Sequence, residues 1–195
     1  MKTYVLASKN QHKAEEIKEI LGKGFEIITQ TEAGAGDIDV VEDGTTFEEN
    51  AAKKALAIME ATGKPTIADD SGLCVDYLDG APGVYTARYA GENADNEANI
   101  AKLLDVLKDV PIMKRGAKFV CVIALAEPGK EVKYFRGECS GRITDKKYGD
   151  GGFGYDPIFF TEKYERTMGE LEPHIKNAIS HRSAALKKLQ RYLAE

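Results

Sequence analysis

The sequence predicts an α/β fold, for three reasons. Short apolar runs with strand character alternate with longer segments whose apolar residues recur at helical spacing. The chain has 195 residues, enough for one domain with a sizeable core, and 43% of them are apolar. No low-complexity stretch interrupts this pattern, so we expect a single folded domain over residues 1–195.

The predicted elements follow one another along the chain. Strands are expected at residues 2–7, 25–28, 66–68, 118–126 and 131–143. Helices are expected to begin near residues 11, 45, 95 and 181. The second helix starts with Thr45 followed three residues later by Glu48, the pattern of a capping box. The run 118–126 is apolar on both alternations, which predicts a central strand, and 131–143 is its expected hairpin partner.

Composition and charge exclude several classes of protein. No apolar run is long enough to span a membrane, and the first seven residues lack a signal-peptide core, so we expect no membrane association. The net charge of −5 argues against a broad nucleic-acid surface, although a local basic pocket for a small polyanion is compatible with it. Three scattered cysteines without a CxxC pair favour reduced thiols and a cytoplasmic location.

Two adjacent carboxylates, Asp69 and Asp70, follow the predicted strand at residues 66–68, and Ser71-Gly72 then predicts a sharp turn. Ligands of open α/β sheets bind at the carboxyl ends of strands. Adjacent strand side chains point to opposite faces, so we expect one carboxylate to serve as a metal ligand or base and the other to hold the turn. A plain Asp-Asp-Ser-Gly turn is the alternative.

A phosphate cradle and a metal site are also expected. The segment Ser8-Lys9-Asn10 joins a strand to a helix, and Lys9 and Lys13 make that helix N-terminus a candidate phosphate site, the alternative being an ordinary capped helix start. Glu42 precedes the second helix, where it either favours the helix dipole or joins Asp70 on a divalent metal. Mg²⁺ fits, since it takes one or two carboxylates plus phosphates and water.

A glycine-rich loop, residues 149–154, contains a formal GxGxxG. The dinucleotide-binding interpretation fails because an Asp-Pro and a strand-like run follow the loop, where that motif requires a helix. The chain has no GxxxxGK[ST], which excludes a P-loop enzyme. Phe153 and Tyr155 on this loop either stack on a flat base or pack into the core.

The last helix is expected to begin with Ser180 as its cap and with His181 and Arg182 in its first turn. Cations there oppose the helix dipole, and such a local mismatch is typical of a functional site. Both side chains can donate hydrogen bonds, as recognition of purine carbonyl oxygens requires.

Taken together, these motifs resemble the non-canonical purine nucleoside triphosphate pyrophosphatase family, the relatives of inosine triphosphate pyrophosphatase, nearly from end to end. The residues that carry the resemblance are Ser8 to Lys13, Glu42, Thr46 to Ala51, Ala68 to Leu73, Gly80 to Tyr89, Gly152 to Pro157 and Lys176 to Arg182. It implies an elongated mixed β-sheet flanked by helices, with two lobes around a central cleft. It also implies a Mg²⁺-dependent homodimer that cleaves ITP, dITP and XTP to the monophosphate and pyrophosphate.

The resemblance assigns a role to each matching position. Asp70 is implied to accept the proton of the attacking water and, with Glu42, to bind Mg²⁺. The residues implied to bind substrate are Ser8, Lys9, Asn10, Gln11, His12, Lys13, Ser71, Phe153, Gly154, Tyr155, Asp156, Lys176, His181 and Arg182. Ser183 and His174-Ile175 depart from the family pattern near the base.

Two rival functions stay open at this point. One is a Maf-type pyrophosphatase acting on other nucleotides, which the Phe-Gly-Tyr-Asp and Ser-His-Arg motifs disfavour. The other is a catalytically silent nucleotide-binding module. Glu42 and Asp70 disfavour it, because binding alone needs no base.

Overall fold

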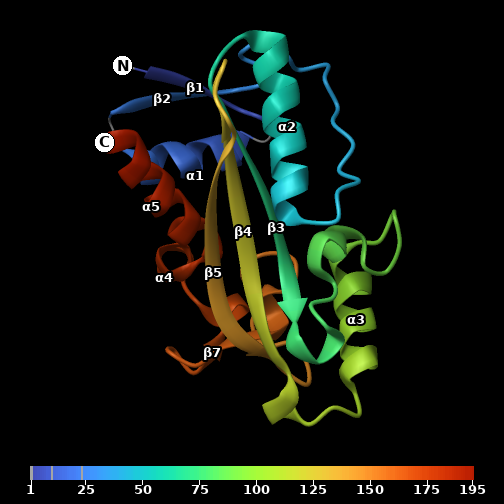
Figure 1. Ribbon diagram of the computed structural model, residues 1–195. Helices are drawn as coiled ribbons and strands as arrows, with labels where there is room; N and C mark the ends of the chain where they lie inside the picture. The colour runs from blue at the N-terminus through green and yellow to red at the C-terminus, as the bar shows by residue number, and fades with distance from the viewer. Residues whose placement is uncertain (1, 10, 23) are drawn as a thin grey trace. The chain divides into compact units, whose positions relative to one another are not determined.

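The computed structural model describes residues 2–9, 11–22 and 24–195 of the chain, and Figure 1 shows its helices and strands. The strands are β1 (Lys2–Leu6), β2 (Phe25–Thr29), β3 (Thr66–Val75), β4 (Gly116–Ala126), β5 (Lys133–Ile143), β6 (Phe159–Thr161) and β7 (Arg166–Thr167). The α-helices are α1 (Gln11–Leu21), α2 (Phe47–Thr62), α3 (Asn96–Leu107), α4 (Pro173–Ile179) and α5 (His181–Ala194).

The strands form one mixed sheet in the order β2-β1-β3-β4-β5-β6-β7. Strand β1 pairs in parallel with both β2 and β3. Strand β6 pairs antiparallel with β5 and with β7. This mixed sheet with helices confirms the predicted α/β class and the hairpin partnership of β4 and β5.

The chain divides into two compact units, with boundaries inside the long strands β3, β4 and β5 and at the start of α5. Unit 1 comprises residues 1–70, 121–137 and 182–195, and unit 2 comprises residues 71–120 and 138–181. No helix of the described residues has both the length and the apolar content that crossing a membrane would need.

In unit 1, helices cover both faces of the strands. Tyr4 and Leu6 of β1 face a core to which α1 and α5 contribute, whereas Val5 between them faces a core that includes Ile58 of α2. This is the alternation that a strand imposes on successive side chains. Figure 1 accordingly shows α1 and α5 on one side of these strands and α2 on the other.

Unit 2 has its own core. Helix α3 contributes Ile100, Leu103 and Leu107, which recur at helical spacing and are buried. Phe119 of β4 and Phe159 of β6 pack together in the same core, with ring centroids 4.3 Å apart. The loops of unit 2 are therefore anchored to a hydrophobic core within that unit.

Two predictions at the element level were wrong. Strand β3 does not end before Ser71-Gly72 but continues to Val75, because Gly72 and Leu73 are buried in the sheet and no turn forms there. The capping box of α2 also lies one residue further along than predicted. Its cap is Thr46, whose side chain accepts from the Glu49 backbone N–H at 3.1 Å while Glu49 reaches back to the cap.

Candidate active site

Asp69 and Asp70 are neighbours in β3 and have different partners within unit 1. Asp69 is buried, with 5% of its surface exposed, and its Oδ2 lies 3.6 Å from Nη2 of Arg182. Asp70 is half-buried and interacts instead with Asn50 and Glu42. Neighbouring strand residues point to opposite faces, so the two carboxylates have different surroundings, as the sequence predicted. The predicted role of the second carboxylate was wrong: Asp69 pairs with Arg182 and holds no turn, because β3 continues through Ser71 and Gly72.

Burial raises the pKa of the Asp70 carboxyl to about 6. The positive charge of Lys54 lowers this pKa, the negative charge of Glu42 raises it, and a hydrogen bond from the Asn50 side chain lowers it. A carboxylate whose pKa is raised toward neutrality is a better proton acceptor than an ordinary one. Asp70 is therefore suited to take a proton from water.

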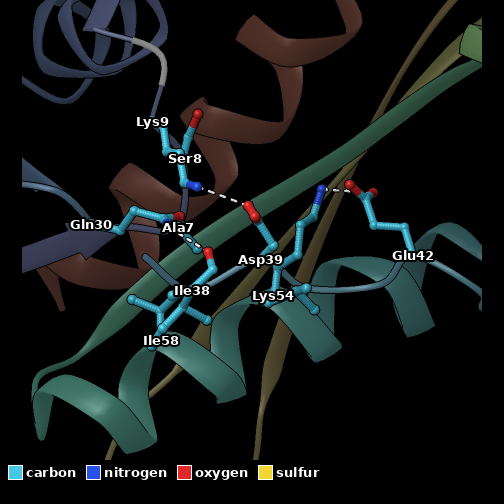
Figure 2. A pocket seen from close by; sticks show the side chains of 10 residues that line it. Ala7, Ser8, Lys9, Gln30, Ile38, Asp39, Glu42, Lys54 and Ile58 are labelled. Atoms are coloured by element: carbon cyan, nitrogen blue, oxygen red, sulfur yellow. Dashed lines mark hydrogen bonds and ion pairs between the residues drawn. The ribbon is translucent and has the colours of Figure 1, made fainter. Parts of the chain in front are cut away.

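Lys54 of α2 connects the two carboxylate-bearing segments of unit 1. Its Nζ donates to Oε2 of Glu42 at 2.9 Å and to the backbone oxygen of Asp69 at 2.8 Å. The Lys54 side chain is largely buried, with 16% of its surface exposed. Figure 2 shows the ammonium group directed at the Glu42 carboxylate. The ammonium group of Lys54 is thus held beside Glu42, one of the two predicted metal ligands.

Ser8 and Lys9, at the end of β1, line a cavity of about 370 Å³ together with Glu42 and Lys54 (Figure 2). This volume lies within the roughly 300–1,000 Å³ that is typical of small-molecule sites. Nζ of Lys9 pairs with Oδ1 of Asp39 at 2.8 Å on the cavity wall. The charged side chains that line the cavity therefore form two ion pairs, Lys9 with Asp39 and Lys54 with Glu42.

The remaining residues predicted for the phosphate cradle follow Lys9 directly. Gln11, His12 and Lys13 form the first turn of α1, so the predicted sequence of strand, short turn and helix start is confirmed. Asn10 lies outside the described residues.

The carboxylate pair of Glu42 and Asp70 fits a magnesium ion. Among the described residues, no group of three or more His, Cys, Asp or Glu side chains could hold a metal by itself. Mg²⁺ does not need such a group, because it keeps several waters and takes one or two carboxylates together with substrate phosphates. The electrostatic coupling between Glu42 and Asp70 indicates that a cation between them would relieve a mutual repulsion.

In unit 2, the glycine-rich loop is tied to helix α4 by an ion pair. Nζ of Lys176 lies 2.5 Å from Oδ2 of Asp156, and that same oxygen accepts the backbone N–H of Phe153 at 2.9 Å. Nζ of Lys176 also lies 4.5 Å from the centre of the Phe153 ring. Gly152 and Gly154 adopt positive φ angles of 73° and 58°, which let the loop close around this pair. The loop thus holds its exposed ring in a defined position.

The two aromatic residues of this loop differ in exposure. Phe153 is 64% exposed, so much of its ring is accessible to a ligand although Nζ of Lys176 lies over one face. Tyr155 is buried, and its hydroxyl donates to the backbone oxygen of Thr86 at 2.8 Å. Core packing, one of the two alternatives that the sequence left open, applies to Tyr155, whereas the exposure of Phe153 is compatible with the other alternative, stacking on a base. The side chain of Tyr155 anchors the loop and offers no stacking face.

The other predicted site residues of unit 2 are partly buried. Ser71 directly follows Asp70 in β3. His181 begins α5 as predicted, and its ring stacks on Phe119 with centroids 5.1 Å apart and an angle of 19° between planes. The imidazole is thereby fixed in orientation by an aromatic partner. Helix α4, which carries Lys176, was not predicted.

The two departures from the family pattern do not disturb packing. Ser183 is buried on α5, with 3% of its surface exposed, so a small side chain suits this position. Ile175 packs against the core of unit 2, and His174 is exposed. None of these three residues takes part in the contacts described above between the glycine-rich loop and Lys176.

Fold and site together define an α/β enzyme that acts on a phosphorylated substrate. The sequence pattern of the Ham1 family matches residues 4–192. The chain therefore belongs to the Ham1 family.

Relatives with assigned names are similar over the whole chain. A protein of Oceanobacillus iheyensis named dITP/XTP pyrophosphatase is 50% identical over 194 residues, covering 99% of this chain and 98% of its own. A Bacillus subtilis protein of the same name is 47% identical over 194 residues, with 99% and 98% coverage. The solved structure of the Staphylococcus aureus Ham1 protein matches with a TM-score of 0.92 and 48% identity, covering 99% of this chain and 98% of that one.

Sequence reasoning missed two residues of unit 1 that contact the predicted metal ligands, Asn50 and Lys54. Both lie on the face of α2 that also carries the buried Ile58. A polar residue in an otherwise apolar helical stripe is the signal that could have identified them, because burial of a polar group without a partner is costly.

Proposed function

We propose that this protein hydrolyses the triphosphates of deaminated or oxidised purines, ITP, dITP and XTP, to the monophosphate and pyrophosphate, with Mg²⁺ as cofactor. The reaction removes abnormal purines from the nucleotide pool. The observation that carries the catalytic assignment is the raised pKa of Asp70 beside Glu42 and Lys54. The names of the relatives described above support the substrate class.

The residues of unit 1 are proposed to handle the triphosphate. Ser8, Lys9 and the first turn of α1 bind phosphate oxygens, since backbone N–H groups and the helix dipole favour anions at that place. Mg²⁺, when bound, neutralises phosphate charge and makes a coordinated water more acidic. Glu42 and Asp70 hold the ion, and the Asp70 carboxylate takes the proton of the attacking water. Lys54, held at Glu42, supplies a further positive charge.

The residues of unit 2 are proposed to handle the nucleoside. The exposed ring of Phe153 stacks on the purine. Lys176 and Asp156 keep that ring in place, and His181 donates to a base oxygen. Ser71 and the backbone of Gly154 and Tyr155 complete the contacts. Arg182, which belongs to unit 1, is a further proposed substrate-binding residue.

Selectivity is proposed to rest on the purine substituents. Hypoxanthine and xanthine present an oxygen at position 6 and no amino group at position 2. Guanine shares the 6-oxygen, so its rejection requires a clash or an unpaired donor at position 2. Equal cleavage of GTP and ITP would refute this account.

The assembly and location are proposed as well. A homodimer follows from the family resemblance, and exposed side chains of unit 2 such as Tyr77, Tyr85 and Met113 are available for an interface. A cytoplasmic location agrees with three cysteines that form no disulfide in the described part of the chain. Light scattering on the purified protein tests the dimer, and a mass of one chain, 21.3 kDa, would contradict it.

The decisive experiment measures pyrophosphate and orthophosphate released from ITP, XTP, dITP, GTP and ATP, with Mg²⁺ and with chelator. We expect pyrophosphate from the first three, lost with chelator and small for GTP and ATP. Orthophosphate would mean attack on the terminal phosphate and a different reaction. Activity mainly on other nucleotides would favour the Maf-type rival, and no product from any of them would favour a silent binding module.

A further inference from the structure

A buried asparagine of unit 1 hydrogen-bonds one predicted metal ligand, Asp70, and the loop that carries the other, Glu42. Asn50, in the first turns of α2, has only 1% of its surface exposed. The other buried residues of this helix are apolar: Phe47, Ala51, Ala55 and Ile58. A buried amide without hydrogen bonds costs about 1–3 kcal/mol, so Asn50 must be retained for the bonds that it makes.

Both ends of the Asn50 amide are engaged. Its Oδ1 accepts the backbone N–H of Gly44 at 2.8 Å, and its side chain hydrogen-bonds the carboxylate of Asp70. An amide has one accepting and one donating end. Because a backbone N–H can only donate, the Gly44 N–H must bond Oδ1 of Asn50. The NH₂ group of Asn50 is therefore the end that donates to the Asp70 carboxylate. This assignment follows from the network of partners.

The geometry at Gly44 shows how tightly this connection is built. A Cβ at position 44 would lie 2.6 Å from Oδ1 of Asn50 and 2.8 Å from Cβ of Glu49, closer than real atoms approach. Only glycine permits the contact. Gly44 is two residues beyond Glu42, so the bond also restrains the loop that carries that carboxylate. The capping box of Thr46 and Glu49 fixes the start of the helix from which Asn50 projects.

We propose that Asn50 is a positioning residue that orients the Asp70 carboxylate and holds the Glu42 loop against it, so that the two acids form one Mg²⁺ site. Asn50 itself contacts neither metal nor substrate. The proposal rests on the proposed function and deepens it, since it assigns the geometry of the metal site to a third residue. Outer partners of metal ligands typically contribute 10–100-fold to metal affinity or activity.

Two substitutions distinguish the hydrogen bond that Asn50 makes to Gly44 from the one that it makes to Asp70. Asn50→Ala removes both, whereas Asn50→Asp keeps an acceptor for the Gly44 N–H and cannot donate to Asp70 at pH 8. The matched control is Asn99→Ala. Asn99 is another buried asparagine, in α3 of unit 2, which bonds the backbone of Ala87 and Ala90 and none of the predicted metal ligands.

The first measurement is the melting temperature of the nucleotide-free protein titrated with MgCl₂ alone, because an ion that binds only the folded state raises it. We expect the Mg²⁺ concentration at half-maximal shift to rise about tenfold or more in Asn50→Ala, and to be unchanged in Asn99→Ala. The second measurement is steady-state hydrolysis of ITP at saturating Mg²⁺. We expect kcat to fall about 10–100-fold in both Asn50 variants, with KM changed less than about threefold.

A wild-type Mg²⁺ midpoint in Asn50→Ala, or a wild-type kcat in either Asn50 variant, would overturn the proposal. Should Asn50→Ala fail to fold, Asn50→Asp still decides, because it preserves the anchor to Gly44. A purely structural role predicts the same loss of melting temperature in Asn50→Ala and Asn99→Ala with no change in the Mg²⁺ midpoint. If the wild-type protein itself shows neither a Mg²⁺ shift nor turnover, the proposed function fails and the assignment of Asn50 falls with it. If the wild type shows both and the Asn50 variants match it, only the assignment of Asn50 fails.

Discussion

Nζ of Lys54 lies 2.9 Å from Oε2 of Glu42, in a place where little of the lysine is exposed. The same nitrogen donates to the backbone oxygen of Asp69, so one cation joins the loop before α2 to the strand that carries Asp70. Lys54 is largely buried whereas the Glu42 side chain is 38% exposed, so the effect of removing Lys54 is expected mainly on the position of the Glu42 loop relative to β3.

We therefore expect Lys54→Met to lower kcat/KM for ITP by about 10- to 100-fold, equivalent to about 1.4–2.7 kcal/mol of transition-state stabilisation. The control is Lys53→Met on the same helix, whose partner Asp43 is exposed on the surface. Surface pairs contribute about 0–1 kcal/mol, so this control should be active. Equal loss in both variants would remove the special role of Lys54.

Asp70→Asn is expected to abolish turnover while leaving the fold intact, since the amide can neither accept a proton from water nor bind Mg²⁺ as a carboxylate does. A loss of at least about a thousandfold in kcat is expected, which corresponds to about 4 kcal/mol. Circular dichroism tests whether the fold is intact, and pyrophosphate release tests whether turnover is lost. Wild-type turnover in this variant would refute the catalytic assignment.

The same variant should stabilise the metal-free protein in a pH-dependent manner. The pKa of Asp70 is raised to about 6 by burial, so the folded state holds its proton more tightly than the unfolded state does. The stabilising effect of this group is complete below about pH 4 and is lost as the pH rises through 6. In chelator, Asp70→Asn should therefore melt above the wild type at pH 8, by up to about 3 kcal/mol of unfolding free energy, and match it near pH 4. A pH-independent difference would contradict the burial of the charge.

Phe153→Ala should raise KM for ITP by about tenfold, since stacking of a base on an aromatic ring contributes about 1–3 kcal/mol. The substitution removes an exposed ring that Lys176 holds in position. Inhibition by pyrophosphate alone should not change, because that ligand has no base. Tyr134→Ala, which removes another exposed ring, is the control for general effects. A shift in pyrophosphate inhibition equal to the shift in KM would argue against stacking.

Arg115→Leu should destabilise unit 2 without touching the chemistry. Arg115 is 5% exposed and donates to the backbone oxygens of Val110 and Thr144, each at 2.9 Å. Leaving two buried carbonyls without donors costs about 2–4 kcal/mol, or roughly 5–15 °C in melting temperature. The kcat at 25 °C should be unchanged, and the exposed neighbour Lys114→Leu should leave melting unaltered. Wild-type melting of Arg115→Leu would show that these bonds contribute little.

Local patterns were sufficient for most of the architecture. Strand β1, the start of α1 at Gln11 and the hairpin neighbours β4 and β5 follow from apolar periodicity and turn residues near in sequence. The Ser-Gly pair after Asp70 misled because its turn propensity is weak compared with sheet pairing and burial, which carry β3 on to Val75. The missed helix α4 is seven residues long, too short for a periodic signal.

By itself, the sequence determined the α/β class, the two carboxylates and the loop residues, because each depends on residue type and spacing within a short segment. Only the tertiary structure decided which side chains meet across segments. Asn50 and Lys54 reach Asp70 and Glu42 from one helix, Phe153 is exposed while Tyr155 is buried, and Asp69 pairs with Arg182. Such contacts depend on how helices pack against the sheet, and that packing is set by burial over the whole chain rather than by any one stretch of it.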